Sequence, residues 1–149
     1  MSSVATLTLR LATTADADGI QSLLERSGLP TSDLSTARPE FIVAISDGTI
    51  IGTGALEHFG AAALLRSLAV EPMWRGSGIG RLIVTELEQR ARAAGISELI
   101  LLTLTAGDLF TRLGYDAKER GQVPPAVRHS AEFRSLCPAS AVCLAKSLP

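Results

Sequence analysis

A glycine-rich stretch in the middle of the chain has the residue types of an anion-binding loop. Glycine occupies every second position from 76 to 80, directly after Arg75. The residues before it predict a buried strand and those after it an amphipathic helix, so the glycines form the entry of that helix. Amides in the first turn of a helix lack internal partners and lie at the positive end of its dipole. Glycines let a bulky anion reach those amides, and Arg75 can add a charge-assisted contact. This pattern predicts a diphosphate site.

Two common phosphate-binding motifs do not fit the stretch. A nucleotide P-loop ends in Gly-Lys-Ser/Thr, whereas this chain has Gly80-Arg81-Leu82. A dinucleotide fingerprint needs a third glycine at the position held here by Arg81 or, one frame later, by Ile83. The plainer alternative is a glycine-rich loop that only begins a helix and binds nothing.

The elements that would position this loop follow from hydrophobic periodicity. Strands are predicted at 7–11, 41–45, 50–57, 63–70, 98–104 and 141–145, and helices at 13–28, 78–94, 108–113 and 126–133. Residues 31–39 are predicted to be a loop or a short helix, and Asp47-Gly48 a hairpin turn. The order predicts one domain over 1–149, of α/β class with a mixed sheet and helices on its faces.

Composition excludes several classes of protein. The 149 residues are 46% apolar and 19% charged, as in a globular domain, and the net charge of −1 gives no basic surplus for nucleic acid. The longest apolar run is too short to span a membrane, and the N-terminus does not resemble a signal peptide. Cys137 and Cys143 fit no zinc spacing and are interpreted as reduced, buried thiols. We expect a cytoplasmic protein without a nucleic-acid or membrane partner.

The segment 68–81 resembles the coenzyme A signature of the GNAT N-acetyltransferase superfamily. In it, a strand ending in Val-x-Pro is followed by Arg-x-x-Gly-x-Gly. The element order matches this superfamily from Leu7 to Leu144. The resemblance implies a GNAT-like fold with a splayed strand pair, acetyl-CoA as co-substrate and no metal.

Other segments narrow the resemblance. Residues 63–70, 102–105 and 135–143 are similar to the arsenic-resistance branch of the family, and parts of the second half to the acetyltransferase domain of N-acetylglutamate synthase. This implies an acceptor that is small, acidic and like an amino acid. A glutamate-like organoarsenical such as arsinothricin, or a phosphinothricin-like compound, is the expected example.

The resemblance also implies which residues bind coenzyme A. Backbone groups of the splayed strand would bind the pantetheine arm, and the amides of the glycine-rich loop would bind the diphosphate. The predicted cofactor-binding residues are Leu68, Ala69, Val70, Arg75, Gly76, Ser77, Gly78, Ile79, Gly80, Arg81, Thr105 and Phe110.

Acetyl transfer to an amine needs a base, and Glu57, near the end of its strand, is the predicted one. A solvated strand-end carboxylate is the alternative interpretation, and His58 is the second candidate base. Many relatives carry a tyrosine that protonates the thiolate, but this position holds Phe110. Tyr115 is predicted to be a packing residue. Solvent, Thr105 or Ser67 remain as sources of the proton.

Arg66 is unusual in an apolar strand, because a buried guanidinium must meet an anion. A structural ion pair, for instance with Glu57, and a substrate acid group are the two alternatives. The predicted substrate-binding residues are Arg66, Ser67, Arg128 and Ser140, and Arg134 is a further candidate.

These observations predict an acetyl-CoA-dependent N-acetyltransferase that acts by direct attack in a ternary complex. The alternatives are an acetyltransferase for a protein N-terminus, a polyamine or an antibiotic, and an acyl-CoA sensor without catalysis. Relatives are often dimers, so the resemblance also implies a homodimer.

Overall fold

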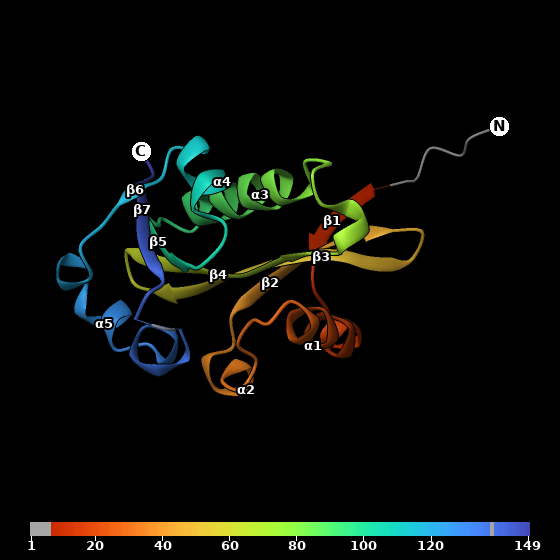
Figure 1. The fold of residues 1–149 in the computed structure, drawn as a ribbon, viewed down its shortest axis with the longest axis horizontal. Helices are drawn as coiled ribbons and strands as arrows, with labels where there is room; N and C mark the ends of the chain where they lie inside the picture. The colour runs from red at the N-terminus through yellow and green to blue at the C-terminus, as the bar shows by residue number, and fades with distance from the viewer. Residues whose placement is uncertain (1–6, 138) are drawn as a thin grey trace.

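The computed structural model describes residues 7–137 and 139–149, and its centre is one seven-stranded sheet (Figure 1). The strand order is β1-β2-β3-β4-β5-β7-β6. β4 and β5 are parallel, and the other neighbouring pairs are antiparallel. The strands are β1 (Leu7–Leu11), β2 (Glu40–Ser46), β3 (Thr49–Phe59), β4 (Ala62–Val70), β5 (Glu98–Thr103), β6 (Asp116–Ala117) and β7 (Val142–Ser147). The predicted mixed sheet of α/β class is confirmed.

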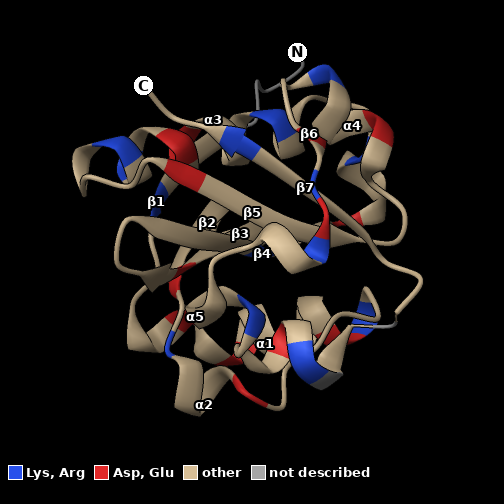
Figure 2. Cartoon of the chain, turned by 90° about the vertical axis from the view of Figure 1, so that its left-hand side faces the viewer, with Lys and Arg blue, Asp and Glu red and all other residues tan. Residues whose placement is uncertain are grey.

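Helices cover both faces of the sheet, as predicted (Figure 1). α3 (Ile79–Ala93) and α4 (Gly107–Arg112) lie on one face. On the other face lie α1 (Ala17–Arg26), α2 (Leu34–Ala37) and α5 (Pro125–Arg128). In the side view, Lys and Arg segments are interspersed with Asp and Glu segments (Figure 2). None of the helices in the described part of the chain is long and apolar enough to cross a membrane.

α3 packs unusually close to the sheet because β3 carries glycines beneath it. The buried face of α3 includes Ile79, Ile83 and Leu87. A Cβ atom on Gly52 would lie 2.9 Å from Ile83, and one on Gly54 only 2.7 Å from the same side chain. Glycine at these two strand positions therefore lets the isoleucine side chains rest directly on the β3 backbone. The close packing fixes the buried face of α3 against β3.

β4 and β5 separate after a short stretch of pairing. Residues Ala62–Leu64 pair with Glu98–Ile100, and no pairing follows between the two strands beyond this point. On its other edge, β4 has an irregular register with β3, where Ser67 has a φ of +59°. A bulge of this kind bends a strand and increases its twist. The bend in β4 accounts for the predicted splay of the strand pair.

The structure differs from the sequence analysis at two places. The strand β6 was not predicted, because two residues are too few to show a period. The predicted helix over 126–133 is broken, since α5 ends at Arg128 and a separate π-helical turn, η4, spans Glu132–Leu136. The Ser130 amide bonds back to the Val127 carbonyl, and the Phe133 amide donates to the Ser130 hydroxyl at 3.4 Å. These bonds at Ser130 turn the chain between the two helical segments.

Candidate active site

The glycine-rich loop forms the N-terminal entry of α3, as predicted. Gly76 and Gly78 have φ values of +81° and +89°, a region that side-chain-bearing residues avoid. A Cβ atom on either would meet no heavy atom within 4 Å, so the backbone conformation and not crowding requires glycine. Within the described residues, the amides of residues 78–81 have no backbone acceptor. The loop thus offers several free N–H groups at the positive end of a 15-residue helix.

Two side chains of the loop bond to the backbone around it. The Arg75 Nε donates to the Val70 carbonyl oxygen at 3.1 Å, and the Ser77 hydroxyl donates to the Trp74 carbonyl oxygen. The Val70 carbonyl oxygen therefore already accepts a hydrogen bond from Arg75. A carbonyl oxygen has two lone pairs, so the predicted binding of a pantetheine arm by the backbone groups of Val70 stays a prediction. Arg75 keeps its two terminal nitrogens for an anion.

A cavity of about 460 Å³ lies where β4 and β5 separate. It is enclosed by β4, by β5 and the residues after it, by the segment after α1, and by the C-terminal segment around η4. Five of the predicted site residues line it, namely Arg66, Ser67, Leu68, Thr105 and Phe110. Glu57, Arg128 and Ser140 are not among its lining residues, and Arg128 and Ser140 are exposed elsewhere. The splay therefore creates the cavity, and the structure brings together only part of the predicted acceptor site.

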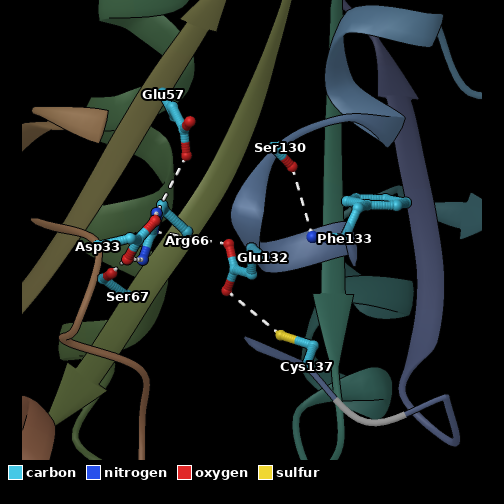
Figure 3. A network of polar contacts seen from close by, with 8 residues as sticks. All are labelled: Asp33, Glu57, Arg66, Ser67, Ser130, Glu132, Phe133 and Cys137. Atoms are coloured by element: carbon cyan, nitrogen blue, oxygen red, sulfur yellow. Dashed lines mark hydrogen bonds and ion pairs between the residues drawn. The ribbon is translucent and has the colours of Figure 1, made fainter. Parts of the chain in front are cut away.

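Arg66 is the centre of a buried ion-pair cluster beside the cavity (Figure 3). Its side chain is 0% exposed. It donates hydrogen bonds to both oxygens of Asp33, at 2.6 and 2.8 Å, and to Glu57 Oε1 at 3.0 Å. The hydrogen bonds from Arg66 hold the pKa of the Asp33 carboxyl below its usual value. Of the two alternatives for this arginine, the structure shows the ion pair.

Glu132 is a cavity residue that the sequence analysis did not identify. It lies on η4, is 5% exposed and points toward Arg66 (Figure 3). Its Oε1 accepts a hydrogen bond from the Cys137 thiol at 3.5 Å, whereas its Oε2 has no hydrogen-bond partner among the described residues. Arg66 Nε lies 3.6 Å from Oε2, an ion-pair contact. Burial raises the pKa of this carboxyl to about 7.

The two cysteines occupy different environments. Cys143 is buried, as predicted, and packs in a cluster with Leu64 and Ile100. Cys137 is only partly buried and lines the cavity. Burial and the neighbouring Glu132 raise the pKa of the Cys137 thiol to about 12. The Cys137 sulfur is therefore a protonated thiol at neutral pH and a weak nucleophile.

The two candidate bases from the sequence lie on β3. Glu57 is buried, and its hydrogen bond to Arg66 is described above. His58 is exposed at the strand end, with Nε2 3.0 Å from Glu40 Oε1. Neither residue lines the cavity. The role of Glu57 as base stays a prediction, and from this position Glu57 would act through water rather than directly.

Comparison with known proteins identifies the family. A family model described as the acetyltransferase (GNAT) domain matches residues 37–117, more than half of the chain. The matched range contains β4, the glycine-rich loop, α3 and β5. The chain belongs to the GNAT acetyltransferase family.

Relatives of this GNAT chain include several acetyltransferases. It is 37% identical over 89 residues to an uncharacterized N-acetyltransferase of Chlorobaculum tepidum, covering 59% of this chain and 57% of that protein. It is 32% identical over 124 residues to the amino-acid acetyltransferase of Aeromonas salmonicida, covering 77% of this chain and 28% of the relative. An IAA acetyltransferase of Azospirillum brasilense is 41% identical over 76 residues, covering 48% and 50%. The chain thus spans about half the length of the first two curated relatives it matches.

Solved structures share the fold over nearly the whole GNAT chain. N-acetylglutamate synthase of Neisseria gonorrhoeae, complexed with coenzyme A and N-acetyl-glutamate, has a TM-score of 0.83 and 24% identity, covering 99% of this chain and 36% of that one. A Mycobacterium tuberculosis protein in complex with CoA has a TM-score of 0.82 and 27% identity, covering 95% and 99%. The predicted similarity to N-acetylglutamate synthase is confirmed, and the arsenic-resistance branch stays a prediction.

The GNAT domain has no tyrosine at the position where the sequence analysis expected a general acid. Phe110 lies there, buried against the cavity and edge-on to Tyr115, with ring centroids 5.3 Å apart. Tyr115 is 1% exposed, donates to Glu88 Oε2 at 2.7 Å and does not line the cavity. Burial and this hydrogen bond raise the pKa of its phenol. Tyr115 is therefore a packing residue, as predicted.

Proposed function

We propose that this GNAT domain transfers the acetyl group of acetyl-CoA to the amino group of a small molecule. The observation that carries the proposal is the position of the glycine-rich loop at the N-terminus of α3, directly after the strand that splays to form the cavity. The loop would hold the diphosphate through its free amides, and the cavity would take the thioester end and the acceptor. Solved relatives in complex with coenzyme A support this proposal.

The proposed acceptor is a small, acidic compound that resembles an amino acid. Support comes from the relatives named amino-acid acetyltransferase and from the neighbour complexed with N-acetyl-glutamate. Arg66 is the only cationic side chain among the described residues that line the cavity, and three carboxylates already surround it. An acid group that binds Arg66 directly would therefore have to displace one of these carboxylates. An arsinothricin-like or phosphinothricin-like compound is the finer proposal, from the resemblance to the arsenic-resistance branch.

The proposed chemistry is direct attack of the amine on the thioester within a ternary complex. Cys137 is the only described thiol at the cavity, and its raised pKa opposes a role as an acyl carrier. A backbone amide of β4 near the bulge would polarise the thioester carbonyl. The predicted cytoplasmic location and homodimer stay predictions, the second of which light scattering on the purified chain would check.

Calorimetry with acetyl-CoA and an assay of free coenzyme A release test the proposal together. The assay panel contains L-glutamate, phosphinothricin, arsinothricin, a polyamine and a peptide with a free N-terminus. We expect binding of acetyl-CoA and turnover of an acidic amino acid. Turnover of only the polyamine or the peptide would overturn the acceptor class, and failure to bind acetyl-CoA would overturn the function. Binding without turnover would favour the acyl-CoA sensor, which the absence of a tyrosine at position 110 keeps as the second candidate.

A further inference from the structure

The cavity has one carboxylate in its wall, and this group is Glu132. Among the described residues that line the cavity, Glu132 is the only acidic side chain. It is more than nine-tenths buried, yet its Oε2 has no hydrogen-bond partner among the described residues. The ion-pair contact of Oε2 with Arg66 Nε at 3.6 Å is too long for a hydrogen bond, so this buried oxygen can still accept one from a donor. A donor bound in the cavity, such as an ammonium group, would satisfy this oxygen.

Four groups surround Glu132 and come from different parts of the chain. Arg66 on β4 faces Oε2 at 3.6 Å, and Cys137, just after η4, donates to Oε1. Asp33 and Glu57 lie around the same guanidinium and act on Glu132 through their charge. Asp33 and Glu57 make shorter contacts to Arg66 than Glu132 does. Their negative charges therefore offset much of the stabilisation that the Arg66 charge gives to an ionised Glu132. Burial is then the largest effect on the Glu132 carboxyl, and it raises the pKa of this group to about 7. A general base works best with a pKa near the operating pH.

Glu57 is placed less favourably than Glu132 for the role of base. Its Oε1 already accepts a hydrogen bond from Arg66 at 3.0 Å, and the residue is not part of the cavity wall. A base must lie within hydrogen-bond reach of the proton it removes, directly or through one water. The Arg66 side chain contacts both Glu57 and Glu132 (Figure 3), and of these two carboxylates only Glu132 lines the cavity.

We propose that Glu132 is the general base of the acetyl transfer, an inference that rests on the proposed function. The acceptor ammonium gives one proton to Glu132, and the free amine attacks the thioester carbonyl carbon. The new N–C bond forms, the C–S bond breaks, and the electron pair of that bond leaves with the sulfur. The amine nitrogen loses its second proton as the tetrahedral intermediate collapses, and the coenzyme A thiolate takes one proton. One proton per turnover is released to solvent.

The test is the pH dependence of kcat in Glu132→Gln, with L-glutamate as acceptor or, if it is not used, the fastest amine of the panel. For the wild type we expect kcat to fall as the pH drops below about 7. For E132Q we expect kcat at pH 7 to be lower by about 10²- to 10⁴-fold, the usual contribution of a general base. The kcat of E132Q should rise roughly tenfold for each unit by which the pH is raised, because the amine then loses its proton to solvent and not to a base of the protein. Calorimetry should give a Kd for acetyl-CoA within about twofold of the wild type.

Two further variants separate this role from a structural one. Glu88→Gln removes another buried carboxylate, which pairs with Lys146 and does not line the cavity, and its pH profile should match the wild type. Glu57→Gln should keep the fall in kcat below pH 7. The proposal would be overturned if E57Q lost the fall in kcat below pH 7. It would also be overturned if E132Q kept this fall and had the kcat of the wild type. Should E132Q not fold, Glu132→Asp withdraws the carboxylate by one methylene, and an unchanged kcat there would also overturn it. No turnover of any amine by the wild type would instead refute the proposed function.

Discussion

Asp33 and Arg66 lie 33 positions apart in the sequence, yet both oxygens of the Asp33 carboxylate accept hydrogen bonds from the Arg66 guanidinium. This paired contact ties the loop before α2 to the middle of β4. The same loop region, residues 27–32, forms one wall of the cavity. The ion pair therefore sets the position of a cavity wall as well as the charge beside it.

Asp33→Asn should destabilise the protein by about 1–3 kcal/mol at pH 7, because a nearly buried arginine loses one of its charged partners. The folded-state pKa of Asp33 is lowered, so its stabilisation is present above the ordinary aspartate pKa and is lost as the pH falls through the folded value. The difference from the wild type should therefore shrink at acidic pH. Urea unfolding at pH 7 and pH 3 measures it, with the exposed Asp116→Asn as control. Equal stability of D33N and wild type at pH 7 would contradict the prediction.

Gly78→Ala should weaken acetyl-CoA binding by about tenfold or more. An alanine at a φ of +89° costs about 1 kcal/mol or shifts the loop, and either change disturbs the amides that would bind the diphosphate. Gly60→Ala is a matched control, since Gly60 also has a positive φ, of +70°, and open space around its Cβ position, but lies in the turn between β3 and β4. Calorimetry should show a raised Kd for G78A alone. A similar Kd in both variants would argue against the loop as the cofactor site.

Tyr115→Phe should leave kcat within about twofold of the wild type and lower the stability by about 1–2 kcal/mol. The lost hydroxyl is the donor to Glu88, whose other partner, Lys146, remains at 3.1 Å. Thermal unfolding and steady-state kinetics measure the two effects separately. A large loss of kcat in Y115F with normal folding would show that the phenol takes part in the chemistry.

Glu132→Gln should become more stable relative to the wild type as the pH rises from about 4.5 to 7. The folded-state pKa of Glu132 is raised, so the wild type has the associated stability below the ordinary glutamate pKa and loses it as the pH rises through about 7. Glutamine does not titrate. A shift of this size corresponds to a change of up to about 3 kcal/mol in the difference between the two proteins. Urea unfolding at pH 5 and pH 8 tests it, and a difference that does not vary with pH would contradict the assignment.

Patterns within a few neighbouring residues were sufficient to predict most helices, strands and tight turns. The apolar face of α3 has the period of a helix, and the Asp47-Gly48 turn has positive φ at both residues, as a tight hairpin requires. The glycine-rich loop was predicted for the same reason, since its glycines and the helix that follows are adjacent in the sequence. The two-residue strand β6 and the break at Ser130 have no comparable local signal.

The acceptor side of the site could not be predicted in this way. Glu132 acquires its environment from Arg66, 66 positions earlier, and from a π-helical turn that periodicity does not indicate. The only nearby sequence feature is that Glu132 precedes the aromatic residue Phe133. The same pair of residues also fits an exposed helix. Glu57 was favoured because it follows an apolar run, but the same strand geometry directs it to Arg66.

The sheet is weakest between β4 and β5, because these two strands pair over only a short stretch. In the described part of the chain, strand pairing joins the sub-sheet β1–β4 to the sub-sheet of β5, β7 and β6 only between residues 62–64 and 98–100. Apolar packing and the Arg66–Glu132 ion pair hold the two parts together elsewhere. Small rocking of one half against the other should be the softest motion of the molecule. A ligand bound in the cavity between β4 and β5 would contact both sub-sheets and restrict this motion. Its binding should therefore slow amide hydrogen exchange in both sub-sheets.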